Sequence, residues 1–356
     1  MGTLLPAISL AIVHIAGDNA GVVPDAAALC GADIYIVTVI AYMVIGVLIS
    51  ALCAWVGACS GFELGVLVRR QYGCPGKKLL AVAILVVSIP ASALTGGYFC
   101  GWLVHGLTGL PQPLAALLCL AVFTLLAAGN WDELLAVSGY GSLLMVPMVL
   151  VLFLAGDTTA ALPERPAGNI DWLLVLALAS YNSGGMRPLL VTEAAAYLMK
   201  RGRRAVLLAI AAKALEGIIT VIMAQVVISA GAHGPLALSA AAEKLLGPAG
   251  GILFDCSLLC VFLNTMVPAM MVNARQTASL TGLKFWPSLL AAGAAVCLIA
   301  QLDYKGVLTI MSGAGVLMVG VVAYTACQLH KQKVGLKDNK PFQSRTMIIE
   351  KPENIS

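Results

Sequence analysis

The sequence predicts an all-α polytopic membrane protein with about ten transmembrane helices. Hydrophobic residues make up 60% of the 356-residue chain and charged residues only 11%, whereas roughly a quarter of an average soluble domain is charged. Apolar runs of about 18–25 residues, each long enough to cross about 30 Å of hydrocarbon, follow one another along most of the chain. Two of these runs are interrupted by the same pattern of polar residues, glycine and proline, which indicates a functional site inside the membrane.

The predicted spans form a single transmembrane domain over residues 1–330, and residues 331–356 are expected to form a flexible, polar, cytoplasmic tail. The ends of each span are taken from the limits of its apolar run. The expected spans cover residues 3–24, 34–57, 79–105, 112–129, 137–155, 171–199, 205–230, 250–273, 285–302 and 306–329. The first five spans occupy about residues 1–156 and the second five about residues 170–330.

Lysine and arginine gather in loops that this order of spans places on one side of the membrane. Arg69 and Arg70 lie between spans two and three, Lys200 between spans six and seven, and Arg275 and Lys284 between spans eight and nine. Because cytoplasmic loops are enriched in these residues, both termini are predicted to be cytoplasmic. The formal net charge of +4 is spread over the loops. Lipid is therefore the expected surrounding, and neither nucleic acid nor an obligate protein partner is indicated.

The interruptions lie in the first and the sixth predicted spans. The first span contains HIAGDNAG at residues 14–21, and the sixth contains SYNSGG at residues 180–185, each followed by a proline three residues on. Glycine permits unwound backbone and proline removes a helical hydrogen bond, so both segments are expected to be broken helices. One such site is explained by a kink or by close helix packing. Two sites five spans apart, on helices running in opposite directions, indicate an inverted repeat.

At the family level, the chain resembles the five-plus-five inverted repeat of the leucine-transporter fold, in the amino acid–polyamine–organocation superfamily. Two segments carry the resemblance: SYNSGGMRPLLVTEAAAYLMKRG at residues 180–202 and LLGPAGGILFDCSLLCVFLNTMVPAMMVNARQ at residues 245–276. Within the superfamily the chain is similar to the YkvI-like bacterial membrane proteins. The resemblance follows the order of spans over nearly the whole chain, and it implies a multi-pass protein of the bacterial inner membrane.

The resemblance implies a small-molecule substrate held between the two breaks, near the bilayer midplane. The expected substrate-binding residues are Gly17, Asp18, Asn19, Gly21, Tyr181, Asn182, Ser183, Gly184, Gly185 and Arg187. Asp18 is the strongest single indication, because a carboxylate in mid-membrane is costly unless it is paired or hydrated. It can serve as counter-ion to a substrate ammonium, as a Na⁺ ligand or as a proton carrier, or it can form a structural pair with Arg187. Arg187 can instead grip a substrate carboxylate or neutralise Glu193.

Ion coupling is expected where span eight faces span one. The resemblance implies that polar side chains of span eight and backbone carbonyls of span one together hold a Na⁺ ion, for which oxygen ligands are suited. The expected ion-coupling residues are Gly17, Ala20, Asn264, Thr265, Asp18 and His14. No cofactor and no resident metal are expected, apart from Na⁺ as a coupling ion.

Three further charged residues lie inside predicted spans. Lys213 and Glu216 are three positions apart on span seven, so they are neighbours on one helix face, and a self-neutralised ion pair is favoured over a proton relay. Asp255 falls near the outer end of span eight and is expected to reach the membrane interface.

These features favour a secondary active transporter for an amino acid or a small amine-bearing metabolite, coupled to Na⁺ or H⁺ and working by alternating access. A ligand sensor or receptor subunit of the same fold, without transport, is the alternative from another class. A divalent-metal transporter using Asp18, Asn19 and Met186 is a third reading. An enzyme is not indicated, because the chain has neither a His-Glu-x-x-His motif nor a Gly-x-Ser-x-Gly elbow.

Overall fold

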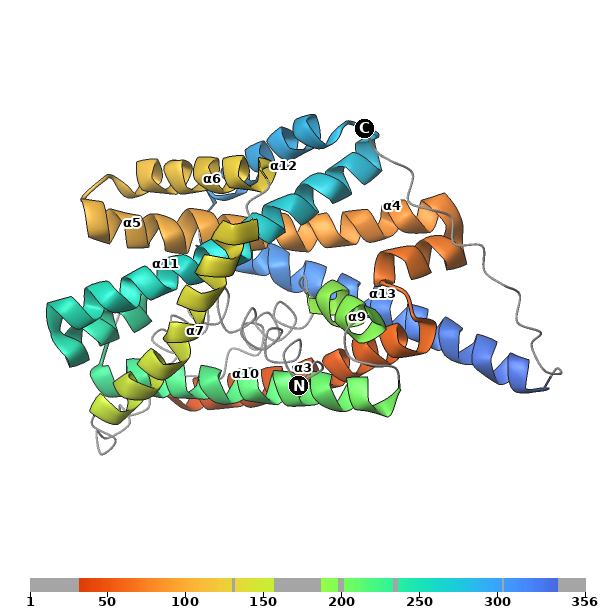
Figure 1. The fold of residues 1–356 in the computed structure, drawn as a ribbon, viewed down its shortest axis with the longest axis horizontal. Coiled ribbons are helices and arrows are strands. Elements are labelled where there is room, and N and C mark those ends of the chain that lie inside the picture. The colour runs from red at the N-terminus through yellow and green to blue at the C-terminus, as the bar shows by residue number, and fades with distance from the viewer. Residues whose placement is uncertain are drawn as a thin grey trace.

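The computed structural model describes residues 32–129, 132–156, 187–197, 202–232, 236–302 and 304–338. Within these residues every regular element is a helix (Figure 1). The elements are α3 (Ala32–Ser60), α4 (Leu64–Ser92), the π-helix η2 (Ala93–Phe99), α5 (Cys100–Thr108), α6 (Gln112–Ala128), α7 (Asp132–Ala155), α9 (Arg187–Tyr197), α10 (Arg203–Ala230), α11 (Ala237–Thr281), α12 (Phe285–Ile299) and α13 (Tyr304–Asp338).

The described helices have the length and composition of membrane spans, which confirms the multi-pass, all-α prediction. Five stretches are long and apolar enough to cross a membrane: Met43–Ser60, Leu64–Thr108, Arg203–Ala230, Ala237–Thr281 and Thr309–Lys331. Shorter apolar helices cover Gln112–Ala128, Leu144–Ala155 and Phe285–Ile299. The predicted first span at 3–24, and the part of the sixth before Arg187, lie outside the described residues. The prediction of ten spans is therefore neither confirmed nor excluded.

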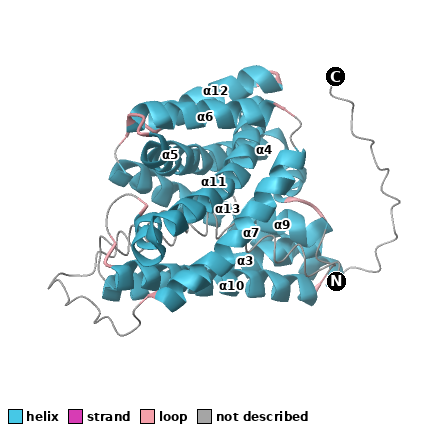
Figure 2. Cartoon of the chain, turned by 60° about the vertical axis from the view of Figure 1, so that its left-hand side comes forward, coloured by secondary structure: helices cyan, strands magenta, loops and turns pink. Residues whose placement is uncertain are grey.

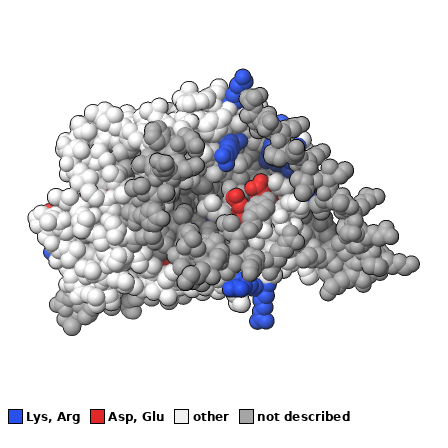
Figure 3. All heavy atoms as spheres, in the orientation of Figure 1, with Lys and Arg blue, Asp and Glu red and all other residues white. Residues whose placement is uncertain are grey.

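The outer surface of the helices carries large aliphatic side chains. Leu154 is 81% exposed, Leu298 72% and Leu125 67%, as is expected for side chains that face lipid. Figure 3 shows a largely uncharged left half of this face, whereas most of its visible lysine and arginine lie in the right half. A protein with so many exposed aliphatic side chains is stable only where hydrocarbon covers them.

Two long helical stretches are bent near their starts by a glycine of positive φ. Gly73 in α4 has φ 66° and is followed by Pro75, and Gly247 in α11 has φ 75° and is followed by Pro248. Only glycine adopts this backbone without strain. The helices continue after each bend, so that Leu64–Thr108 and Ala237–Thr281 each run for 45 residues. The helices thus begin before the predicted spans at 79–105 and 250–273, since the segments before each bend are helical too.

The last helix is also longer than predicted. α13 continues to Asp338, so the first residues of the segment expected as a flexible tail, from residue 331, are helical. The continuation has a local cause, since no glycine or proline interrupts the chain between the apolar run and Gly335 and glutamine, leucine and lysine favour helix.

Helices from the two halves of the chain pack against one another in corresponding pairs. α3 packs on α10, α4 on α11 and α6 on α12. The contacts between unlike helices correspond as well. α7, the last described helix of the first half, packs on α11 of the second half, and α13, the last helix of the second half, packs on α4 of the first. In Figures 1 and 2 α6 and α12 lie at one edge of the molecule, α3 and α10 lie at the opposite edge, and α4 and α11 lie between them.

Glycines allow α3 to approach α9 and α10 closely. A Cβ at Gly57 would lie 2.1 Å from the carbonyl oxygen of Thr192 in α9, and a Cβ at Gly46 would lie 2.2 Å from Cε of Lys213 in α10. Gly217 of α10 in turn faces Met43 of α3. The glycines of α3 thus determine how closely α9 and α10 can pack on it.

We expect Gly57→Ala to destabilise the fold by about 1–3 kcal/mol, the usual cost of overpacking, because the added methyl meets backbone of α9. Thermal unfolding of the purified protein in detergent measures the effect. Gly65→Ala is the matched control, since a Cβ at Gly65 meets nothing within 4 Å. A Gly57→Ala variant that unfolds at the same temperature as the control would contradict the close packing of α3 and α9.

Candidate functional site

Most of the predicted site residues lie outside the described part of the chain. The residues concerned are His14, Gly17, Asp18, Asn19, Ala20 and Gly21 in the first break and Tyr181, Asn182, Ser183, Gly184 and Gly185 in the second. Met186, of the divalent-metal reading, lies outside it as well. The described residues of the predicted site are Arg187, Asn264 and Thr265, and α9 holds the first of them directly after the second break.

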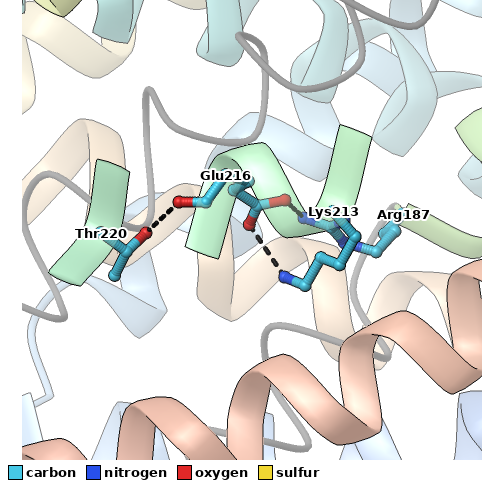
Figure 4. A network of polar contacts seen from close by, with 4 residues as sticks. All are labelled: Arg187, Lys213, Glu216 and Thr220. Atoms are coloured by element: carbon cyan, nitrogen blue, oxygen red, sulfur yellow. Dashed lines mark hydrogen bonds and ion pairs between the residues drawn. The ribbon is translucent and has the colours of Figure 1, made fainter. Parts of the chain in front are cut away.

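Arg187 belongs to a buried ion cluster, shown in Figure 4, that joins α9 to α10. Its side chain contacts Glu216, with Nη2 donating to Oε2. The other carboxylate oxygen of Glu216 accepts a hydrogen bond from Lys213 Nζ at 2.9 Å. Arg187 is 3% exposed, and Lys213 and Glu216 are 0% exposed. Two cations thus converge on one carboxylate in a buried part of the bundle. We call Arg187, Lys213 and Glu216 the ion cluster.

The ion cluster confirms one interpretation of the sequence and extends it. The predicted pair of Lys213 and Glu216 forms within one helix turn. The contact of Arg187 with Glu216 was not predicted, because the two residues are 29 positions apart and on different helices. Glu193, one of the partners considered for Arg187, is exposed.

The contacts of the ion cluster account for the buried charge of Glu216. A charge taken out of water costs several kcal/mol unless it is paired and hydrogen-bonded. The carboxylate of Glu216 meets this condition, because each of its oxygens forms an ion pair. The backbone carbonyl of Glu216 also accepts a hydrogen bond from Thr220 Oγ1 at 2.9 Å. The cluster therefore fixes the start of α9, the helix that follows the second break, against the middle of α10.

A second buried network joins α4 to α11 without any charge. Ser88 Oγ donates to Oδ1 of Asn273, and Asn273 Nδ2 donates to Ser92 Oγ at 3.1 Å. Asn273 is 0% exposed. Ser92 directly precedes the π-helix η2, and π-helical turns are frequent at functional sites. The sequence analysis missed this network and η2, because a π-helix has no distinct signature in an apolar run.

The predicted Na⁺ residues lie on α11 between its two prolines. Asn264 and Thr265 are partly buried, and Thr265 Oγ1 donates to the Val261 carbonyl at 3.0 Å. A hydroxyl that donates to backbone keeps its lone pairs for a cation. The facing backbone of Gly17 and Ala20 is outside the described residues, so Na⁺ binding here stays a prediction.

On the side of the basic loops, Glu63 lies in the turn between α3 and α4. Partial burial raises the pKa of the Glu63 carboxyl, the negative charge of Glu193 on α9 raises it further, and Arg275 on α11 opposes both effects. This carboxyl therefore holds its proton to a higher pH than a free glutamate does.

Comparison with known proteins shows the fold. No protein-family model matches the chain, and no curated protein matches it in sequence. Among solved structures it is similar to Mhp1, a nucleobase-cation-symport-1 family transporter, in a closed conformation with bromovinylhydantoin bound. The TM-score is 0.62 at 15% sequence identity, over 92% of this chain and 76% of that one. The chain thus has the leucine-transporter-like fold that Mhp1 has.

Proposed function

We propose that the protein is a secondary active transporter for an amino acid or a small amine-bearing metabolite, coupled to Na⁺ or H⁺. The observation that carries the proposal is the likeness to a cation symporter over 92% of the chain. The two sequence breaks, which keep their polar residues, support it further. We retain the narrower YkvI-like assignment as part of this proposal, on the two segments that resemble that group.

The architecture that we infer is an inverted repeat of five helices in each half. The paired packing of α3 with α10, α4 with α11 and α6 with α12 supports it. The bends at Gly73 and Gly247 support it independently, because they interrupt corresponding helices near their starts and are each followed by proline. In this arrangement the broken helices cross the membrane in opposite directions and meet at its centre.

The substrate in this proposal lies between the unwound segments of the first and sixth spans. Asp18 is the counter-ion of the substrate ammonium, and the N–H groups at the start of the half-helix after the second break receive a carboxylate. The contact of Arg187 with Glu216 favours a positioning role for the arginine, which holds α9 in place, over a direct grip on the substrate. Asn264 and Thr265 complete the coupling-ion site together with Gly17 and Ala20.

Alternating access in this proposal is a rocking movement of one helix bundle against the others. The ion cluster lies within α9 and α10, which pack on α3, so these helices would move as one body. The Ser88–Asn273–Ser92 network lies within α4 and α11, which would form the static part.

A ligand screen followed by a transport assay tests the proposal. Purified protein is screened by thermal shift against amino acids and amines, with and without Na⁺ and at several pH values, since a ligand of the native state raises Tm. Each stabilising ligand is then tested for counterflow in proteoliposomes. We expect exchange that depends on Na⁺ or on the pH gradient. Binding without exchange would support a sensor instead, and stabilisation by divalent metal alone would support a metal transporter.

A further inference from the structure

A cavity of about 360 Å³ lies between the end of α5 and the first part of α11. Its volume is within the range of small-molecule sites, about 300–1,000 Å³. In Figure 1 α5 and the start of α11 meet at the left end of the molecule, away from the N-terminal end of α10 that carries Arg203 and Arg204. The lining residues come from α5 and from both sides of the bend at Gly247, and none of them belongs to the predicted substrate or ion site.

The polar part of the cavity wall is acidic. Glu243 and Asp255 line it, and the wall that the described residues form contains no lysine or arginine. The neighbouring cation, Lys244, is engaged elsewhere, because its Nζ donates to the carbonyl of Ala230 at the end of α10. Asp255 is held by Ser239, whose Oγ donates to Oδ1 at 2.5 Å. Asp255, which was predicted to reach the membrane interface, lies in the wall of this cavity, one turn beyond Gly251.

The aromatic part of the wall is held in place as well. Trp102 and His105 both line the cavity, and their rings lie edge to face with centroids 5.3 Å apart. His105 Nδ1 lies 2.5 Å from the Leu110 carbonyl. Because a carbonyl only accepts, Nδ1 carries the hydrogen in this contact, which fixes the orientation of the ring.

This composition favours an organic cation over a metal ion. Among the described residues no group of three or more histidine, cysteine, aspartate or glutamate side chains could hold a metal. Two carboxylates beside a tryptophan instead match an ammonium group, which pairs with carboxylate and is attracted to an aromatic face. The apolar side chains of Leu103, Leu236 and Ile252 in the same wall suit the carbon part of such a ligand.

We propose that this cavity, which we call the corner site (Trp102, His105, Ser239, Glu243 and Asp255), binds a small organic cation with an exposed ammonium group. Asp255, oriented by Ser239, and Glu243 balance the charge. The indole of Trp102 covers the apolar side of the ligand. The proposal of the corner site is argued only from contacts of described residues. It does not depend on the proposed transport function.

Titration of the full-length protein in detergent with choline and with ethylammonium tests the corner site. Isothermal titration calorimetry measures the affinity, and 3,3-dimethylbutanol serves as the neutral analogue of choline. We expect saturable binding of the cations but not of the alcohol. Glu243→Gln and Asp255→Asn should each weaken binding by about tenfold or more, as the loss of a charge-assisted contact does. Glu193→Gln, on the exposed face of α9, is the matched control and should leave the affinity unchanged.

Three results would overturn the corner site: no saturable binding of either cation, equal binding of the alcohol, or unchanged binding in the Glu243→Gln/Asp255→Asn double variant. The double variant also separates this site from the predicted central one. Cation binding that persists in the double variant and disappears in Asp18→Asn belongs to the central site, and the proposal of the corner site is then wrong.

If Asp255→Asn does not fold, Ser239→Ala is the replacement, because it removes only the hydroxyl that orients the carboxylate. Trp102→Phe should weaken choline more than ethylammonium, since the quaternary ammonium depends more on the aromatic face.

Discussion

Glu216→Gln is expected to destabilise the protein by about 3–5 kcal/mol, the range measured when one partner of a buried ion pair is removed. Glu216 is 0% exposed and its two carboxylate oxygens contact Arg187 and Lys213. A glutamine side chain has nearly the same shape, so packing is kept and only the counter-charge of the two cations is lost. The folded yield by size-exclusion chromatography and the thermal unfolding temperature in detergent measure the effect.

Glu193→Gln is the matched control for Glu216→Gln, because it makes the same chemical change at an exposed position of α9. It should alter stability by no more than about 0.5 kcal/mol. The double variant Lys213→Met/Glu216→Gln should cost less than the sum of the single variants, since both singles remove the same ion pair. Additive costs would show that Lys213 and Glu216 do not stabilise each other within α10. A Glu216→Gln protein as stable as the control would show that the ion cluster does not hold α9 to α10.

Asp18→Asn is expected to abolish uptake of a cationic or zwitterionic substrate and to leave the folded yield intact. The expectation rests on the sequence, since Asp18 lies outside the described residues. An asparagine keeps the size of the side chain and removes the charge that balances a substrate ammonium or carries a proton. Loss of a charged contact of this kind lowers the rate or affinity by about tenfold to several hundredfold. Uptake of a labelled substrate into proteoliposomes gives the measurement.

Asp25→Asn is the matched control for Asp18→Asn, because Asp25 follows the proline that closes the first predicted break. It should retain most of the uptake activity. Uptake by Asp18→Asn with unchanged kinetics would remove Asp18 from the mechanism. Loss of folded protein in Asp18→Asn, with the control intact, would assign Asp18 to a structural ion pair.

Hydrophobic runs predict the positions of helices well where the helix is apolar throughout. The expected spans 112–129, 205–230 and 285–302 correspond to α6 at Gln112–Ala128, α10 at Arg203–Ala230 and α12 at Phe285–Ile299. The helical segments before Gly73 and Gly247 were missed for a physical reason. They are short and carry charged residues, Arg69 in one and Glu243 in the other. A glycine with a proline close behind it resembles a loop, whereas here positive φ at the glycine lets the helix resume.

Side-chain partners could be predicted only within one helix. The spacing of Lys213 and Glu216 is set by the helical repeat, so their pairing follows from the sequence. The addition of Arg187, and the bonds of Asn273 to Ser88 and Ser92, depend on how separate helices pack. No local pattern contains that information. The same holds for the corner site, whose walls come from α5 and α11.

The bond between Ser88 and Asn273 spans 185 positions of the chain, which has a consequence for biosynthesis. A ribosome adds about 5–20 residues per second, so roughly 10–40 seconds pass between translation of the serine and translation of its partner. During this interval α4 is complete while the helix that covers it has not been made. The hydroxyls of Ser88 and Ser92 must meanwhile be satisfied by their own backbone carbonyls or by water. Until the second half emerges, the first half of the chain is therefore held in the bilayer by its hydrophobicity and by its own packing, such as that of α5 on α6.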